Sequence, residues 1–186
     1  MDLKFVPVVE EQMSVNFTGK VNLLSPFNHQ YLGHLLFKDG KIIDVKYLQL
    51  TGVKAFYQLG IKEHALERHQ YIVEPEIVSS EEQRIHYPFS VLLNKLDKQI
   101  KLYEIVNNQR PPSNVKILVD ASMINSNIDC TPEEFKVLTV LTEYHKVDDI
   151  YDHCDLLDYE VTSSLITLRK KNILKIVGVK RESQTV

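Results

Sequence analysis

An Asp-Gly turn between two apolar segments limits the fold more than any other feature of the sequence. Residues 31–37 (YLGHLLF) and 41–47 (KIIDVKY) flank Lys38-Asp39-Gly40. Asp-Gly suits the positive φ angles of a tight hairpin turn, and two strands joined by such a turn run antiparallel, side by side. The first part of the chain is therefore expected to be built around an antiparallel hairpin.

The segments next to the hairpin predict one helix and one more strand. Val53, Phe56 and Leu59 lie at helical spacing, and Gly60 is expected to end this helix in a left-handed cap. Residues 71–75 (YIVEP) predict a short strand that its proline ends. Residues 1 to about 75 thus form a strand-rich region with a single helix.

The hydrophobic period changes after Pro88. Apolar residues then lie three or four apart among charged ones, which predicts an amphipathic helix of about twenty residues, ended by Pro111-Pro112. Its apolar stripe consists of Phe89, Leu92, Leu93, Leu96, Ile100, Tyr103 and Val106. The stripe is expected to pack inside the protein, and the pattern also permits a homodimer.

A strong helix start opens the last third of the chain. Thr131 can cap the N-terminus of a helix, Pro132 fits the first helical position, and Glu134 can complete a capping box. The stripe expected to be buried in this helix is Phe135, Leu138, Leu141 and Tyr144.

Two further helices and a strand are predicted after it. Residues 147–153 can form a short second helix that buries Val147, Ile150 and Tyr151. Asp158 can cap a third helix over 159–171, in which Val161, Leu165 and Leu168 share one face. Asn172 is expected to end this helix, and residues 173–181 predict a strand. Three helices, the middle one short, followed by a strand are typical of a winged helix, and a generic three-helix cap is the alternative.

The sequence therefore predicts an α+β protein of two modules. The first, residues 1–110, is a small mixed module with a β-hairpin and an amphipathic helix. Residues 111–129 are expected to be a linker, and residues 130–186 a winged-helix-like module.

Charge is segregated in this second module. Acidic residues dominate from 143 to 160, where Lys146 is the only lysine or arginine, whereas residues 169–181 hold basic residues and no acidic ones. The candidate phosphate contacts are Arg169, Lys170, Lys171, Lys175 and Lys180. A DNA-reading helix usually presents its N-terminal part to the bases, and here that part carries Asp158 and Glu160. Electrostatics therefore favour a protein partner over DNA.

The sequence predicts neither catalysis nor a cofactor. His145, Asp149, His153, Cys154 and Asp155 lie close in sequence but lack the spacing of a metal site, so no metal is expected. The glycines form no phosphate-binding motif. Two cysteines suggest free thiols in a reducing compartment, and the chain shows neither a signal peptide nor a membrane-spanning run, so a cytoplasmic protein is expected.

Three segments carry a resemblance to a known family. They are residues 17–21 (FTGKV), the hairpin segment 31–45 (YLGHLLFKDGKIIDV) and residues 52–56 (GVKAF), supported by 71–75 (YIVEP) and 92–97 (LLNKLD). Together they resemble the PATAN-like domain of bacterial signalling proteins over roughly the first 110 residues. The chain departs from that family at residues 23–30, where the family has a leucine-rich helix and this sequence is short and contains Pro26.

The resemblance implies a non-enzymatic regulatory or scaffold protein that mediates protein–protein interaction in bacterial signal transduction. It implies no cofactor and no catalytic residue, and its expected partner is a signalling protein. The alternative is a transcriptional regulator that binds DNA through the basic residues of the winged helix.

Overall fold

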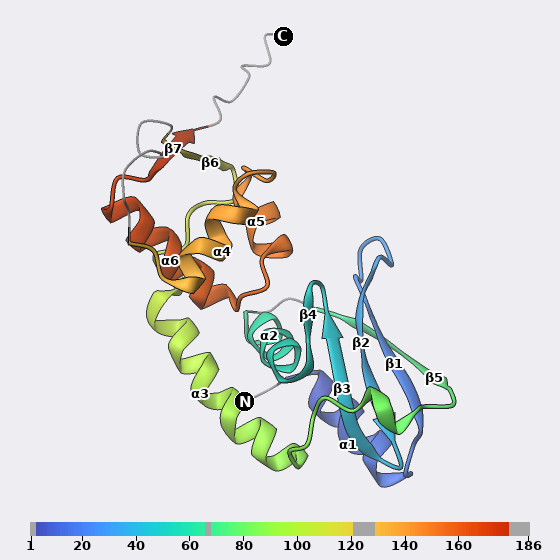
Figure 1. Cartoon of the computed structure of the whole chain (residues 1–186). Coiled ribbons are helices and arrows are strands. Elements are labelled where there is room, and N and C mark those ends of the chain that lie inside the picture. Colours follow the sequence, from blue (N-terminus) through green and yellow to red (C-terminus); the bar gives the residue numbers. More distant parts are fainter. Residues whose placement is uncertain (1–2, 66–67, 121–128, 179–186) are drawn as a thin grey trace, which may run out of the picture. The chain divides into compact units, whose positions relative to one another are not determined.

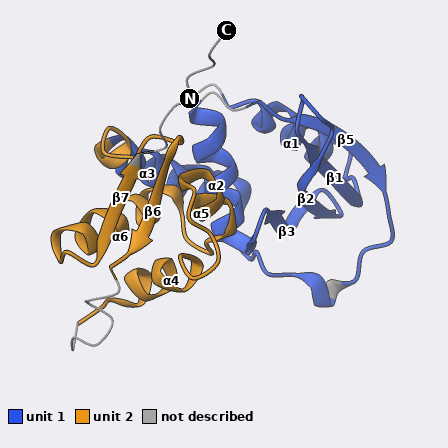
Figure 2. Ribbon diagram, turned by 90° about the horizontal axis from the view of Figure 1, so that it is seen from above, with its two compact units in different colours: residues 1–104 blue, residues 105–186 orange. Residues whose placement is uncertain are grey.

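The chain divides into two compact units of α+β structure. The computed structural model describes residues 3–65, 68–120 and 129–178. Unit 1 spans Met1–Glu104 and unit 2 spans Ile105–Val186 (Figure 2). Unit 1 contains a five-stranded antiparallel sheet and unit 2 a two-stranded one, which confirms the predicted α+β class. No helix in the described ranges is both long enough and apolar enough to cross a membrane.

The sheet of unit 1 forms around the predicted hairpin (Figure 1). Its strand order is β4-β3-β2-β1-β5. Asp39 and Gly40 have φ angles of 49° and 70°, which are the positive values that the turn requires. The strands are β1 (Gly19–Leu24), β2 (Tyr31–Lys38), β3 (Lys41–Tyr47), β4 (Leu50–Thr51) and β5 (Gln70–Pro75).

Helices complete the core of unit 1. They are α1 (Phe5–Ser14), α2 (Gly52–His64) and α3 (Phe89–Asn107), with a short 3-10 helix at Ser80–Glu82. Phe5 of α1 meets Phe56 of α2 edge to face, with ring centroids 5.3 Å apart. As predicted, α3 is a long amphipathic helix, and it buries Leu92, Leu96 and Ile100. The helix α1 was not predicted.

Gly60 does not end its helix, contrary to the prediction. It lies inside α2, which continues to His64. A Cβ at this position would lie 2.4 Å from Leu96 Cδ2 on α3. Gly60 is therefore a packing residue that lets α3 approach α2, and not a cap.

The two edges of the five-stranded sheet differ. Beside β4, the C=O of Ile43 accepts hydrogen bonds from the N–H groups of Arg84 and Ile85, both at 2.8 Å, so the segment before α3 covers that edge. At the opposite edge, β5 pairs with β1 on one side and with no strand of the described residues on the other (Figure 1). Ile72 and Val73 of β5 are 43% and 42% exposed.

Unit 2 contains the three predicted helices, the predicted strand and one strand that was not predicted. They are β6 (Val115–Val119), α4 (Pro132–Val140), α5 (Val147–His153), α6 (Asp158–Lys170) and β7 (Leu174–Gly178). Strand β6 pairs antiparallel with β7 along its whole length, and Lys116 forms an isolated bridge with Lys146 just before α5. Residues 111–129, which were predicted to be a linker, therefore include a strand that belongs to the sheet of unit 2.

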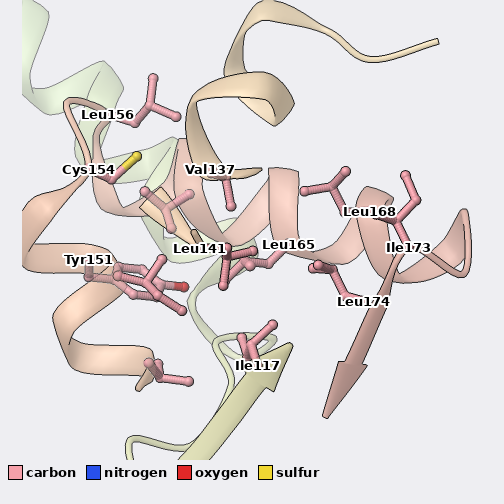
Figure 3. Packing of buried hydrophobic residues seen from close by; sticks show 13 residues of the cluster. Ile117, Val137, Leu141, Tyr151, Cys154, Leu156, Leu165, Leu168, Ile173 and Leu174 are labelled. Atoms are coloured by element: carbon pink, nitrogen blue, oxygen red, sulfur yellow. The ribbon is translucent and has the colours of Figure 1, made fainter. Parts of the chain in front are cut away.

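The core of unit 2 is built from α4, α5, α6 and the sheet. Figure 3 shows Val137, Leu141 and Leu165 pointing toward one another, with Ile117 of β6 beneath them. The predicted face of α6 is buried, and so is the predicted set on α5. Phe135, which was expected in the core, is 65% exposed, because α4 turns Val137 inward instead.

Candidate functional site

The start of α6, where a DNA-reading helix would meet bases, is fixed by the Glu160 carboxylate and by an ion-pair cluster. Leu157 is the N-cap residue, and the Glu160 carboxylate accepts its backbone N–H at 2.9 Å. Asp158 was predicted to cap α6. It is instead the first helical residue, with its side chain 3% exposed.

An arginine neutralises that buried carboxylate. Arg110 Nη1 donates to Asp158 Oδ2 at 3.2 Å, and its Nη2 lies 3.6 Å from Asp148 Oδ1. The guanidinium also stacks over the Tyr151 ring at 4.0 Å, a cation–π contact. One arginine thus joins the segment after α3 to α5 and α6.

Two of the predicted phosphate contacts are held by carboxylates. Lys171 Nζ lies 2.6 Å from Glu134 Oε2 and donates to the C=O of Asp129 at 2.7 Å. Lys175 Nζ lies 2.7 Å from Asp120 Oδ2. A lysine that is paired in this way must break an ion pair before it can neutralise a phosphate.

The remaining candidates are placed differently. Arg169 and Lys170 are exposed in the last turn of α6, where the helix dipole favours cations in any protein. Lys180 lies outside the described residues. Of the four candidates that the structure describes, Arg169 and Lys170 are exposed, whereas Lys171 and Lys175 are held in ion pairs, although the Lys175 side chain is itself 65% exposed.

Glu134 has a purely structural environment. It completes the predicted capping box, because its carboxylate accepts the N–H of Thr131 at 2.9 Å while the Thr131 hydroxyl accepts the N–H of Glu134. Burial by itself raises the pKa of this carboxyl group, but hydrogen bonds from Lys171, Thr167 and the Thr131 backbone outweigh it and lower the pKa. Glu134 therefore stays ionised and holds Lys171.

A groove of about 270 Å³ lies between α4 and α6. Its lining contains three carboxylates, several hydroxyls and no basic residue: Thr131, Glu133, Glu134, Tyr159, Glu160, Ser163, Ser164 and Thr167. Because Lys171 pairs with Glu134, the charge that remains in this groove comes from Glu133 and Glu160, and it favours a cationic or hydrogen-bonding group over phosphate.

The sequence-adjacent metal candidates do not converge. No group of three or more histidine, cysteine or acidic side chains able to hold a metal occurs in the described ranges. His153 stacks on Tyr144 with ring centroids 3.8 Å apart, and its Nδ1 bonds the C=O of Asp149 at 2.9 Å. Asp155 pairs with Lys136 at 2.6 Å. These contacts give the side chains of His153 and Asp155 structural roles.

Cys154 is a poor nucleophile. Its side chain lies in the core of unit 2 (Figure 3), and burial raises the pKa of its thiol to about 11. The thiolate fraction is therefore very small at neutral pH.

Unit 1 contains a buried polar cluster that sequence reasoning missed. The Glu63 carboxylate, at the end of α2, accepts the Phe5 N–H at 3.0 Å and the Tyr71 hydroxyl. His69 Nε2 bonds the Tyr47 hydroxyl at 2.9 Å, and its Nδ1 lies 3.5 Å from Glu63 Oε1. Burial and the bond to Glu63 raise the pKa of Tyr71.

This cluster resembles an acid–base site in composition, but it is enclosed. The side chains of Glu63 and His69 are each 1% exposed, so a substrate cannot reach them. The cluster instead ties α1, α2, β3 and β5 together. The spacing of His69 and Tyr71, two positions apart at the start of β5, was the available signal, but Glu63 could not be assigned to the cluster from the sequence.

A hollow in unit 1 was also not predicted. It has a volume of about 410 Å³ and an apolar floor that includes Ile42 and Ile85. Lys41 and His86 line it, and none of its lining residues is acidic.

Comparison of the chain with protein-family models, curated proteins and solved structures finds no match.

Proposed function

We propose that this chain is a non-enzymatic adaptor that mediates protein–protein interaction in bacterial signal transduction, with the PATAN-like module and the winged-helix-like module as two docking surfaces. The observation that carries the proposal is the pairing of Lys171 and Lys175 with Glu134 and Asp120. Together with the acidic groove between α4 and α6, this pairing opposes a phosphate-binding role for unit 2.

The enclosure of the reactive side chains also supports a non-catalytic role. The acid–base cluster around Glu63 is closed to substrates, and Cys154 is buried and protonated. A chain with interaction surfaces and enclosed polar clusters fits an adaptor better than an enzyme.

A DNA-binding regulator is the second candidate, because Arg169 and Lys170 remain exposed. Fluorescence anisotropy with random duplex DNA separates the two functions. An adaptor is expected to show no binding even at low salt. Binding that weakens steeply as salt rises, and that Arg169→Glu with Lys170→Glu abolishes, would establish the regulator.

Affinity purification from the native cell tests the adaptor directly. The wild-type chain is expected to retain a specific protein, and Glu133→Arg is expected to reduce that capture if the acidic groove is the docking surface. Lys170→Glu, which adds an acid at the other end of α6, is the matched control and should leave capture unchanged. Retention of no protein above a resin control would contradict the proposal.

A further inference from the structure

We propose that β5 pairs with β5 of a second copy of this chain, so that the two five-stranded sheets join edge to edge. This inference goes beyond the adaptor function and does not require it, because it depends only on the free edge of unit 1. Edge strands with unpaired backbone groups are templates for such pairing.

The ladder between β1 and β5 shows which backbone groups face the free edge. The N–H of Glu76 donates to the C=O of Thr18 on the β1 side at 3.5 Å, and the register then continues without a bulge from Gly19↔Pro75 to Leu24↔Gln70. Because successive strand residues direct these groups to opposite sides, the N–H and C=O of Tyr71 and Val73 point away from β1. Pro75, which has no N–H, also faces the free edge, as proline in edge strands does.

Symmetry restricts the register of the pair. A two-fold axis perpendicular to the sheet keeps each side chain on its own face, so residues directly opposite must be an even number apart in sequence. An axis at Ile72 places Tyr71 opposite Val73 of the second copy and forms four backbone hydrogen bonds. An axis at Val73 would place Tyr71 opposite Pro75 and leave the C=O of Tyr71 without a donor in each copy.

The side chains of β5 match in the register centred on Ile72. Gln70 lies opposite Glu74 of the second copy. His29 Nδ1 already donates to Gln70 Oε1 at 2.9 Å, so Gln70 Nε2 remains to donate. Asn22 Nδ2 already donates to Glu74 Oε2 at 2.9 Å, so Glu74 Oε1 remains to accept. Each Gln70 therefore donates to one Glu74 across the axis, and no like charges meet.

The apolar residues match in the same register. Ile72, which is 43% exposed, meets its own copy at the axis. On the other face, Val73 meets Tyr71 of the second copy. Polar pairs that flank an apolar centre make the strand self-complementary, which favours a second copy over an unrelated extended segment.

Sedimentation equilibrium of the full chain, from micromolar to millimolar concentration, tests the proposal. The wild type is expected to form a dimer of twice the 21.6 kDa chain mass. Ile72→Lys and Ile72→Glu each place like charges opposite each other at the axis, and each is expected to remain monomeric at concentrations where the wild type is dimeric. An equimolar mixture of the two variants is expected to dimerise again, because lysine then faces glutamate.

Ile77→Lys is the matched control, since Ile77 lies beyond β5 and is 97% exposed. It adds the same charge and should leave the dimer intact. Far-UV circular dichroism checks that each variant is folded, and recovery in the mixture is itself evidence of folded monomers.

Four results would overturn the proposal. Three of them are a wild type that stays monomeric at every concentration, a dimer that both Ile72 variants retain, and a variant mixture that stays monomeric. The fourth uses Ile105, an exposed residue of α3: a dimer that is lost in Ile105→Lys but kept in Ile72→Lys would place the contact on α3.

Discussion

Replacing Gly33 with alanine is expected to destabilise unit 1 more than any other single methyl addition to its sheet. Gly33 has a φ of 156° and lies opposite Tyr47 in the β2–β3 ladder. A Cβ would stand 2.0 Å from the C=O oxygen of Lys46, 2.7 Å from its carbonyl carbon and 2.9 Å from Tyr47 Cα. All three are backbone atoms, so no side-chain rotation relieves the clash.

The magnitude follows from two costs. Holding a residue other than glycine in this part of φ space costs about 1–3 kcal/mol. Separating strands that are already closely packed adds an overpacking cost of about 1–3 kcal/mol. The free energy of unfolding of unit 1 should therefore fall by about 2–6 kcal/mol.

Gly52→Ala is the matched control. Gly52 also has a positive φ, 65°, but the nearest atom to its Cβ would be Arg84 Cβ at 3.7 Å, an ordinary contact. Only the left-handed backbone cost remains, about 1–2 kcal/mol. Hydrogen exchange of the amides in the Leu35↔Val45 region measures both variants, and it reports on unit 1 separately from unit 2. Equal losses in the two variants would refute the backbone-clash argument.

Three further predictions concern unit 2. Arg110→Met should lower its free energy of unfolding by about 1–3 kcal/mol, because Asp158 stays buried and loses a charged donor; an unchanged urea midpoint would mean that other contacts hold Asp158. The pKa of Glu134 is lower in the folded chain than its ordinary value of 4.5, so its ionised form stabilises the fold above that pH and this stability is lost as pH falls through the folded-state pKa. Glu134→Gln should therefore flatten the acid side of the pH–stability curve. Parallel curves for the variant and the wild type would contradict this. With the pKa of Cys154 near 11, a thiol reagent at neutral pH should modify Cys130 in the folded chain and Cys154 only after unfolding, whereas two rapidly reacting thiols would show that Cys154 is accessible.

Local signals in the sequence were enough to predict most elements of this fold. The Asp39-Gly40 turn requires positive φ angles that few other residue pairs accept, and the Thr131 capping box satisfies its own backbone donors. Such features depend on residues a few positions apart. They can therefore be recognised without knowledge of the rest of the chain.

The wrong predictions occurred where residues distant in the sequence determine the local structure. Gly60 resembles a cap until Leu96 of α3 packs against it, and Phe135 resembles a core residue until the packing of α4 turns Val137 inward. Strand β6 was assigned to a linker because its five residues pair with β7, more than fifty positions later, and with the segment just before α5. Short strands have little hydrophobic pattern of their own, and pairing with a strand that far along the chain gives no signal in the local sequence.

The candidate site shows the same limit in its electrostatics. The sequence contains a run of basic residues from Arg169 onward, and a run alone predicts a phosphate-binding surface. The ion pairs of Lys171 and Lys175 oppose that role, because Glu134 and Asp120, each more than thirty positions earlier, lie within 2.7 Å of their ammonium groups. The charge available to a ligand is what remains after the fold has paired its own residues, so the choice between a DNA-binding and a protein-binding surface depends on tertiary structure and not on the count of lysines.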